Sequence, residues 1–313
     1  MTADQAQPIF RPHLVDQRCA LPELSDERPE RPIKLSILMP AYNEQQTIAR
    51  AVAAVLRQEY PCDHELIVVD DGSTDATSQI LQALAHPRAR VIRHPRNMGK
   101  GAALRTAAVA ASGTHLVPFD ADLEYSPTDL VQMIHPVLAG RAEIVYGVRL
   151  FGANTRYLSY RQAVANRALT LAANVLFDSC LSDMHTCLKL VPVKVFRALG
   201  LEEDGFGLDT EVTAKLLAAG MRPFEVPVSY HSRSALRGKK ITWRDGVECL
   251  HVLARVRATR RVRAGRTEDP LDALAASVEA ALDSSMQLPA DLVLPASAGG
   301  GDSTEDPPRA RAS

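Results

Sequence analysis

Short apolar runs alternate with longer amphipathic segments over residues 34–146. The apolar runs have the length of buried strands and span residues 34–39, 65–69, 89–93, 115–119 and 144–146. The amphipathic segments place apolar residues at helical spacing and span residues 47–59, 76–85, 100–112 and 127–138. Strands separated by helices of roughly 10–15 residues predict an α/β fold, with a mostly parallel central sheet and helices on both faces.

Two further helices are predicted in the second half of the chain. The stretch 163–177 is the most apolar, but Asn166, Arg167 and Asn174 interrupt it, so we interpret it as a buried helix. The stretch 244–263 has apolar residues at helical spacing and ends among arginines. Because the chain has no apolar run of roughly 18 residues and does not begin like a signal peptide, we expect a soluble cytoplasmic protein.

Charge divides the chain into three parts. Residues 1–33 are rich in proline and carry a net charge of −2, and residues 267–313 carry −7, which leaves +8 for residues 34–266. We therefore predict an extended arm over 1–33, a globular domain over 34–255, and over 256–313 the end of a basic helix followed by an acidic, mostly disordered tail. The basic body suggests an anionic partner, and the alternative is a solvated helix face. The five cysteines form no CxxC pair and are too few for a disulfide framework.

Polar residues follow four of the predicted strands, at or soon after the point where each ends. They form the segments Pro40–Glu44, Asp70–Asp75, Asn97–Gly101 and Asp120–Glu124. Each segment alone also fits an ordinary turn or helix cap. Because parallel sheets bind ligands at the carboxyl ends of their strands, four such segments in succession predict one shared ligand site.

Asp120 and Asp122 carry the clearest chemistry. Residues i and i+2 at a strand end project from the same face, where two carboxylates repel each other unless a cation lies between them. Mg²⁺ and Mn²⁺ prefer oxygen ligands and bridge carboxylates to substrate phosphates. We therefore predict Mg²⁺ or Mn²⁺ with a diphosphate here, and Lys100 at a helix start adds positive potential. The chain contains neither GxxxxGK(S/T) nor GxGxxG, which argues against a Walker-type NTPase and a dinucleotide dehydrogenase.

In this order, the four segments resemble the motifs of the family 2 glycosyltransferases, which have the GT-A fold. The resemblance covers roughly residues 34–255. Within the family, the chain most resembles the polyprenyl-phosphate sugar synthases, the dolichyl-phosphate mannose and glucose synthase group. The pointers to this group are Gly147–Arg149, Tyr160–Arg161, Ser182–Leu190, Asp209–Thr213 and Gly238–Gly246.

The resemblance implies a role for each motif. The nucleotide sugar would be bound by Pro40, Ala41, Tyr42, Glu44, Val69, Asp71, Gly99, Lys100 and Asp120, with the Asp71 carboxylate accepting from the base. The metal would be surrounded by Asp120, Asp122 and Glu124. The acceptor phosphate would be bound by Arg149, Arg161 and Arg233. The predicted catalytic residues are Asp122, Arg149 and Arg161, and the alternative for the two arginines is a surface ion pair.

Two residues depart from the pattern of this group. His185 stands where an acidic or small residue is expected, and Leu188 stands where an aromatic residue is expected. If their segment approaches the sugar, the donor differs from the usual glucose or mannose; alternatively, His185 is a plain hydrogen-bonding residue. UDP and GDP donors share similar motifs in the family, and we favour a UDP-hexose or UDP-N-acetylhexosamine.

The implied reaction is a metal-dependent, inverting transfer of a hexose from a UDP- or GDP-hexose to polyprenyl phosphate. An acceptor phosphate is already an anion at pH 7, so positioning suffices and no strong general base is required. One alternative is a soluble saccharide or natural-product hydroxyl as the acceptor, which would need a base such as Asp183, Asp209 or Glu211. The other alternative is a nucleotide-sugar-binding protein without turnover.

The segment 233–266 holds eleven lysines and arginines against Asp245 and Glu248. We predict that it docks the enzyme peripherally on the inner face of the cell membrane, where a polyprenyl acceptor lies. The alternatives are that its helix packs on the core, or that a membrane protein partner supplies the anchor. We expect no nucleic-acid partner.

Overall fold

The computed structural model of the protein describes residues 32–84, 86–149, 155–156, 160–205, 207–231 and 243–263. The predicted arm up to residue 31, Arg233 and the tail from residue 264 lie outside these ranges. The first half of the chain alternates strands and helices: β1 (Lys34–Ala41), α1 (Ile48–Arg57), β2 (Asp63–Asp70), α2 (Thr77–Gln82), β3 (Ala89–Arg93), α3 (Lys100–Ala110), β4 (His115–Pro118), α4 (Pro127–Leu138) and β5 (Val145–Val148). The second half continues with β6 (Thr155–Arg156), α5 (Tyr160–Phe177), β7 (Lys189–Pro192), α6 (Val193–Ala198), α7 (Gly207–Ala218), β8 (Phe224–Pro227), β9 (Tyr230–His231) and α8 (Trp243–Arg263).

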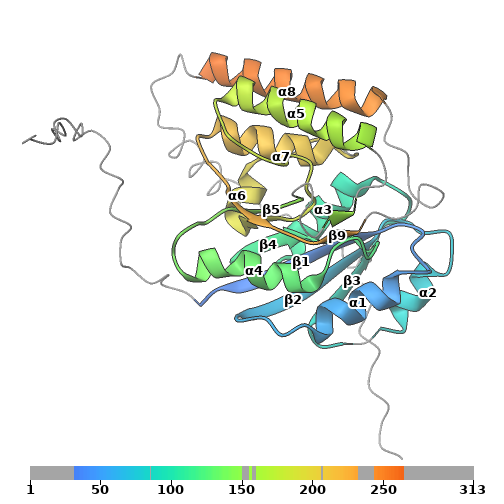
Figure 1. Cartoon of the computed structure of the whole chain (residues 1–313). Helices are drawn as coiled ribbons and strands as arrows, with labels where there is room; N and C mark the ends of the chain where they lie inside the picture. The colour runs from blue at the N-terminus through green and yellow to red at the C-terminus, as the bar shows by residue number, and fades with distance from the viewer. Residues whose placement is uncertain are drawn as a thin grey trace, which may run out of the picture.

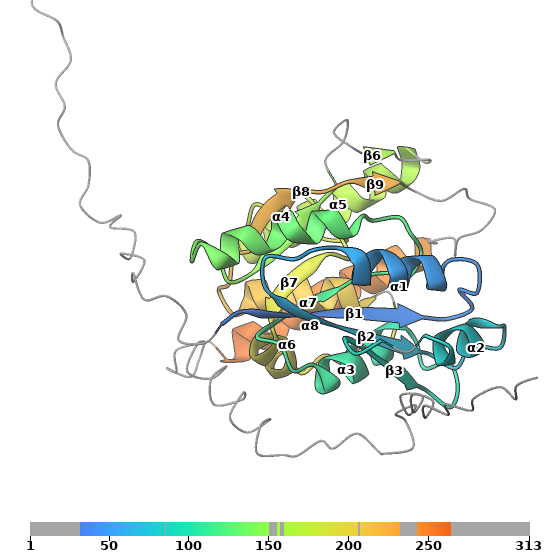
Figure 2. The same cartoon turned by 90° about the horizontal axis from the view of Figure 1, so that it is seen from below.

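Seven strands form one sheet in the order β3-β2-β1-β4-β7-β5-β8. The four strands β3, β2, β1 and β4 run parallel, and β7 runs antiparallel to both of its neighbours. A separate parallel pair joins β6 to β9. Helices α1 and α4 lie on one side of the sheet, while α3, α6, α7 and α8 lie on the other (Figures 1 and 2). The predicted α/β fold with a mostly parallel sheet and helices on both faces is therefore confirmed.

The two faces of the sheet bury alternate residues of the same strands. In β1, Leu38 packs into the core that faces α3 and α7, whereas Ile37 and Met39 pack into the core that faces α1 and α4. In β2, Ile67 packs into the core that faces α3 and α7, and Leu66 packs into the core that faces α1 and α4. Strands buried on both faces read as continuous apolar runs, which is why the sequence pattern identified them.

Strands β7 and β8 of the sheet were not predicted, whereas β4 and β5 were. The sequence pattern missed β7, α6, α7 and β8. Strand β7 begins with Lys189, and β8 contains Glu225 and is only partly buried, so neither forms a continuous apolar run. The helix predicted to be buried over 163–177 exists within α5, but Leu171 and Val175 are exposed on it. At the other end of the chain, α8 runs to Arg263 and so crosses the predicted domain boundary at residue 255.

Two glycines fix the turns at the binding edge of the sheet. Gly72, after β2, has φ +70°, and a Cβ there would lie 2.3 Å from the carbonyl carbon of Arg96. Gly99, before α3, has φ +98°, and a Cβ there would lie 2.3 Å from the carbonyl oxygen of Asp204. Both positions therefore require a residue without a side chain, and both turns bring a distant backbone segment against the strand ends.

Among the described residues, we find no helix that combines the length and the apolar character needed to cross a bilayer.

Candidate active site

The loops after β1 and β2 are bonded directly to each other. The Asp71 backbone N–H donates to the Ala41 carbonyl at 2.8 Å, and the Asn43 N–H donates to the Ser73 hydroxyl at 3.0 Å. The Glu44 N–H donates to the hydroxyl of Thr77 at 2.9 Å. The Asp70–Asp75 segment is therefore the turn and helix entry that its residue types predicted, and at the same time it fixes the loop that follows Pro40.

The predicted nucleoside-binding residues differ in what they expose. Tyr42 is 43% exposed beyond the end of β1, whereas Ala41 and the side chain of Val69 are buried in the core. Contact of Val69 with a ligand would therefore have to come from its backbone. Glu44 accepts a hydrogen bond from the Thr47 hydroxyl at 2.6 Å, so its carboxylate is already held at the start of α1.

Asp71 is only 3% exposed, and its carboxylate organises the loop before α3. One oxygen accepts from the Met98 N–H at 2.9 Å and lies 2.7 Å from Nδ1 of His94, while the other accepts from the Gly99 N–H at 2.8 Å. A carboxylate offers about four acceptor positions, so these three partners leave about one for a ligand. Sequence reasoning found Asp71 but missed His94, because nothing in the local pattern around His94 marks it as a partner.

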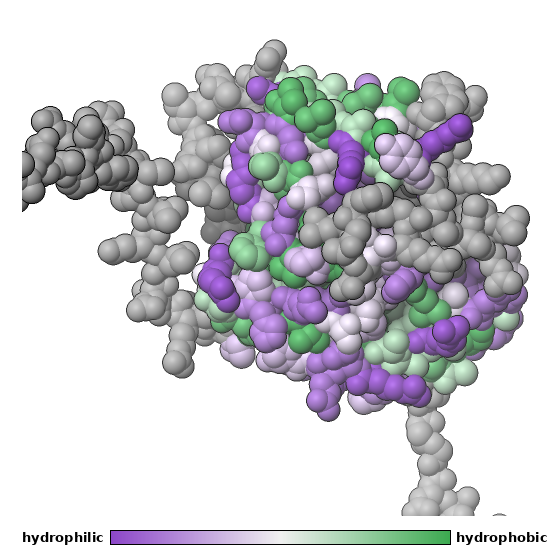
Figure 3. All heavy atoms as spheres, viewed as in Figure 1, coloured by the Kyte–Doolittle hydropathy of each residue, from purple (hydrophilic) through white to green (hydrophobic). Residues whose placement is uncertain are grey.

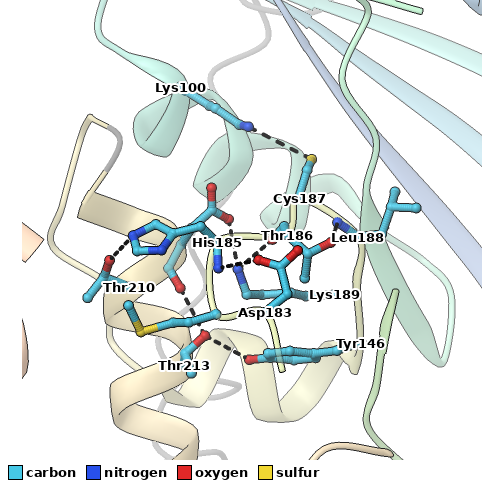
Figure 4. Close-up of polar contacts among 12 residues, drawn as sticks. Lys100, Tyr146, Asp183, His185, Thr186, Cys187, Leu188, Lys189, Thr210 and Thr213 are labelled. Carbon is cyan, nitrogen blue, oxygen red and sulfur yellow. Dashed lines mark hydrogen bonds and ion pairs between the residues drawn. The ribbon is translucent and has the colours of Figure 1, made fainter. Parts of the chain in front are cut away.

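Lys100 extends from the first residue of α3 toward the end of β4. Its ammonium lies 2.8 Å from Oδ1 of Asp120 and 3.8 Å from Sγ of Cys187 (Figure 4). Burial lowers the pKa of Lys100, but the neighbouring Asp120 outweighs this effect and holds the pKa well above its usual value. The predicted pair of a cation and a metal-binding carboxylate thus lies together, and Lys100 is charged at neutral pH.

Asp122 and Glu124 belong to a tight turn beyond β4. Leu123 between them has φ +65°, a conformation that non-glycine residues adopt rarely and mostly at functional sites. Asp122 accepts from the Glu124 N–H at 3.0 Å, and Glu124 accepts from the Tyr230 hydroxyl at 2.9 Å.

The carboxylates of this turn fit a divalent ion that also binds a substrate. Within the described residues, no three acidic, histidine or cysteine side chains converge on one point. Mg²⁺ is usually held by one or two carboxylates together with substrate phosphates, and the oxygen donors of Asp120 and Asp122 match that chemistry.

Arg149 lies just after β5 and forms a buried ion pair. Its Nε and Nη2 donate to the two carboxylate oxygens of Asp183 at 2.6 and 2.8 Å, and the two side chains are 9% and 7% exposed. The guanidinium also lies 5.1 Å from the centre of the Tyr230 ring. Burial raises the pKa of Asp183, but Arg149 outweighs this and the pKa lies below its usual value. For Arg149, the alternative interpretation therefore predicted the ion pair correctly, but the pair is buried and does not lie on the surface.

The structure does not place the three predicted acceptor arginines alike. Arg161 is exposed at the second residue of α5, in contrast to the buried Arg149. Arg233 lies outside the described residues. Tyr230, which sequence reasoning missed, connects the two predicted subsites, because it contacts both Glu124 and Arg149.

A second buried cluster lies beside Lys100, on β7 and the start of α7. Lys189 is 2% exposed and pairs with Asp209 at 3.1 Å. Burial raises the pKa of Asp209, but Lys189 and then Lys100 outweigh this effect and keep the pKa below its usual value. Sequence reasoning named Asp209 as an alternative base, and both residues lie in motifs that pointed to the synthase group. It missed their pairing, since a separation of twenty residues gives no local signal.

His185 belongs to the same cluster (Figure 4). Its Nε2 lies 3.3 Å from the Thr210 hydroxyl and 3.4 Å from Sγ of Cys249, while its buried Nδ1 has no hydrogen-bond partner among the described residues. Burial, reinforced by Lys189, lowers the pKa of His185 to about 4, so the ring is neutral at pH 7.

Glu211, another alternative base, has a structural role. It is fully buried, and its carboxylate accepts from the N–H groups of Glu202 and Glu203 and pairs with Lys215 at 2.8 Å. It holds the segment whose carbonyls contact the start of α3, including the bond from the Gly101 N–H to the Asp204 carbonyl at 2.7 Å. Its carboxylate is therefore turned toward the protein.

Comparison with known proteins places this geometry in a family. The sequence profile of Glycosyl transferase family 2 matches residues 36–200. Among curated proteins, the chain is 31% identical over 210 residues to "Glycosyltransferase AglD" of Haloferax volcanii, covering 64% of this chain and 34% of that protein. It is 25% identical to the "Dolichyl-phosphate beta-glucosyltransferase" of Saccharomyces cerevisiae, covering 68% and 71% of the two chains. The match spans about a third of AglD and 64% of a second archaeal relative, AglJ.

Solved structures show the same fold. Glucosyl-3-phosphoglycerate synthase from Mycobacterium tuberculosis with Mg²⁺ and UDP superposes with a TM-score of 0.56 at 22% identity, covering 73% of this chain and 79% of that chain. The same enzyme with Mn²⁺, UDP-glucose and phosphoglyceric acid gives a TM-score of 0.55 at 20% identity over 72% and 80% of the two chains. The profile match and the shared architecture confirm the family and the fold that the motifs predicted. The chain belongs to glycosyl transferase family 2 and has the GT-A fold of that family.

Proposed function

We propose that the protein is a metal-dependent, inverting glycosyltransferase that moves a hexose from a nucleotide sugar to polyprenyl phosphate. The observation that carries this proposal is a continuous chain of contacts from Asp122 through Glu124 and Tyr230 to Arg149. At one end of these contacts lie carboxylates that suit a metal ion and a diphosphate. At the other end lies the buried guanidinium of Arg149, which suits a second phosphate. Such a connection is what a transfer between two anionic substrates needs, because it fixes donor and acceptor relative to each other.

The donor would lie along the strand ends from β1 to β4. Asp120 and Asp122, with Glu124 beside them, would hold Mg²⁺ or Mn²⁺, which when bound stabilises the departing diphosphate as a Lewis acid. Lys100, charged and directed to the same point, adds positive potential for the leaving group. The nucleoside would contact the exposed Tyr42 and the last acceptor position of Asp71.

The acceptor phosphate would meet the guanidinium of Arg149, whose orientation Asp183 and Tyr230 fix from its edge and its face. Arg161, at the start of α5, and Arg233 are proposed to assist in binding this phosphate. A phosphate oxygen needs no proton removed at pH 7, so positioning is the main task of these residues. The Saccharomyces relative, named a dolichyl-phosphate β-glucosyltransferase, supports a lipid phosphate as the acceptor.

The donor is proposed to be a UDP-hexose or UDP-N-acetylhexosamine. The M. tuberculosis structures with UDP and Mn²⁺ or Mg²⁺ support the choice of base and ion. Peripheral contact with the inner face of the cell membrane through 233–266, directly or through a membrane protein partner, belongs to the same proposal. Of that segment, the structure describes residues 243–263.

The direct test is acceptor use. Purified protein is incubated with Mn²⁺ and radiolabelled UDP- or GDP-sugars, with polyprenyl phosphate or with 3-phosphoglycerate, and then extracted into organic solvent. Label that enters the organic phase only with polyprenyl phosphate and metal supports the proposal. Label that stays in water on phosphoglycerate or a saccharide contradicts the lipid acceptor.

A soluble acceptor is the second candidate, and Asp209 is the observation in its favour. Asp209 is an ionised carboxylate that borders the site and is 16% exposed, whereas Glu211 is fully enclosed. A hydroxyl acceptor needs a base, so Asp209→Asn should then abolish transfer to the hydroxyl. With a phosphate acceptor, the same variant should retain most of its turnover.

A further inference from the structure

Helices α5 and α8 lie side by side at one end of the molecule, beyond α7 (Figure 1). Helix α8 buries Cys249, Val252, Leu253 and Val256 in the core and is thus packed on the domain, as one alternative interpretation predicted. Helix α5 buries Ala163, Thr170, Ala173 and Phe177 in the same way. The opposite sides of the two helices form a common outer surface, which we call the α5–α8 face.

The α5–α8 face exposes an unusual number of large apolar side chains. Six of them are between 45% and 77% exposed: Tyr160, Val164, Leu171, Val175, Val247 and Leu250. On α5 they follow the helical spacing of one stripe, continued by the exposed Ala168. The space-filling view shows apolar surface at the end of the molecule where α8 and α5 lie (Figure 3). Side chains of this kind in one contiguous patch mark a surface that contacts another body.

A shallow hollow runs between the two helices. It has a volume of about 460 Å³ and is lined by Val175, Leu176, Ala254, Arg257 and Ala258. Four of its five lining residues are apolar. The face is therefore apolar in the seam between the helices as well as along the exposed stripe of α5.

The charges on these two helices are almost all positive. Together their sequences contain eight arginines, no lysine and two acidic residues, Asp245 and Glu248. Helix α5 contributes Arg161 and Arg167, both exposed, and no acidic residue. Among these arginines, Arg255 pairs with Glu203 at 2.7 Å. Apolar side chains bordered by arginine match a layer of hydrocarbon beneath anionic headgroups.

We propose that the α5–α8 face is the surface on which the protein lies on a bilayer that contains anionic lipid. This inference rests on the proposed function in one respect, since a lipid acceptor gives the contact its purpose. A second copy of the chain fits the face less well, because two such faces would bring like charges together. The docking surface then includes α5 in addition to the basic segment 233–266 predicted from the sequence. Leu171 and Val175 of α5 would make the apolar contact with the lipid.

The face connects physically to the candidate active site. On the buried side of α8, Cys249 lies 3.4 Å from His185, which in turn interacts with Lys189 and Asp209. Tyr160 and Arg161, at the start of α5, belong to the segment that follows Arg149 in the sequence. Docking through this face would thus place the acceptor side of the site near the headgroups, where the phosphate of a lipid acceptor lies.

Flotation of the full-length protein with vesicles tests the proposal. The vesicles are phosphatidylcholine alone, or phosphatidylcholine with phosphatidylglycerol, at low and at high salt. We expect flotation with the anionic vesicles at low salt and weaker flotation at high salt. The double variant Leu171→Ser/Val175→Ser should lower the vesicle partition coefficient about tenfold or more, because it removes apolar contact without altering charge. Arg167→Glu should lower partitioning to anionic vesicles only.

The matched control is Leu138→Ser/Phe224→Ser, which removes two apolar side chains that are 37% and 44% exposed elsewhere on the surface. It should float like the unchanged protein. Absence of flotation at low salt, or equal loss in the control, overturns the proposal. So does light scattering that shows a dimer which the Leu171→Ser/Val175→Ser variant converts to a monomer. Flotation needs no sugar transfer, so protein that floats but does not glycosylate lipid phosphate would contradict the proposed acceptor and leave this inference standing.

Discussion

The donor half of the site, residues 34–124, and the acceptor half, the described residues from 125 to 263, are built by different means. In the donor half, neighbouring parallel strands end together, and their loops bond to one another, as Asp71 does to Ala41 and Gly99. In the acceptor half, the decisive contacts join segments that are far apart in sequence, as Arg149 and Asp183 do. The order of the strands brings the first set of residues together, and contacts such as the Lys100–Asp120 pair complete it. The second set depends chiefly on side-chain pairs between distant segments.

This difference predicts how each half responds to substitution. A donor-half carboxylate that binds only a ligand is dispensable for folding, so its loss should affect turnover alone. The buried pair of Arg149 and Asp183 in the acceptor half contributes to folding and to substrate binding at once, so the loss of Arg149 should affect both. The four experiments below, from the largest expected effect to the smallest, test that contrast.

The largest effect is expected for Asp122→Asn. The substitution removes one of two proposed metal-binding carboxylates, and we expect kcat/KM to fall by about 10³-fold or more. The melting temperature should hold or rise, because one of two neighbouring like charges is removed. Nucleotide release assayed against Mn²⁺ concentration, together with thermal unfolding, measures both. Asp75→Asn removes a carboxylate from the same edge of the sheet and should retain turnover; normal turnover by Asp122→Asn would refute the metal assignment.

The next effect is expected for Arg149→Ala. It leaves the buried Asp183 carboxylate without its main partner, which should cost about 3–5 kcal/mol of the free energy of unfolding. It should also lower kcat/KM for lipid phosphate by about 10²-fold or more while nucleotide affinity stays constant. Urea unfolding and titration with UDP measure the two quantities.

A second substitution separates these two roles of Arg149. In Arg149→Ala/Asp183→Asn the unpaired charge is gone, so much of the stability should return while acceptor use stays low. Restored transfer in this double variant would show that Arg149 serves the fold alone. A loss of nucleotide affinity equal to the loss of acceptor use would place Arg149 at the donor.

The same contrast explains how far sequence reasoning reached. The donor motifs are contiguous and follow buried apolar strands, so their residues and their convergence were predictable from the order of the elements. The pair of Lys189 and Asp209, and the contact of Tyr230 with Glu124, join residues that are distant in sequence and carry no pattern of their own.

Burial of helices was equally hard to predict. Both α3 and α5 are rich in alanine, yet α3 packs Ala103, Leu104 and Ala107 into the core, whereas α5 exposes Leu171 and Val175. Composition gives the apolar content of a helix, but which side is covered depends on the elements that pack against it.

A smaller effect is expected for Tyr230→Phe, which tests the connection between the halves. The variant loses the hydroxyl that donates to Glu124, worth about 1 kcal/mol, and keeps the ring beneath Arg149. We expect the Mn²⁺ concentration for half-maximal activity to rise about fivefold and the acceptor KM to stay unchanged. Tyr230→Leu also removes the ring and should raise the acceptor KM as well. Identical kinetics of the two variants would contradict separate roles for the hydroxyl and the ring.

The smallest effect at pH 7 is expected for His185→Gln, because a neutral imidazole is replaced by a neutral amide. The effect of this substitution on stability should appear at acidic pH. His185 has its pKa lowered to about 4 by burial, against about 6.5 in the unfolded chain, so between these values the unfolded state binds more protons. The contribution of His185 to the free energy of unfolding should therefore be fully present above about pH 6.5 and fall as the pH drops toward 4, by up to ~3 kcal/mol.

Chemical unfolding measured from pH 7 to pH 4 should show a smaller loss of stability in His185→Gln than in the unchanged protein. The His135→Gln variant, at an exposed histidine, should follow the unchanged protein. His115, whose pKa is also lowered to about 4 by partial burial, is present in all three proteins, so the difference between the curves isolates His185. Superimposable curves for His185→Gln and the unchanged protein would show that the acceptor half opens to solvent at this ring.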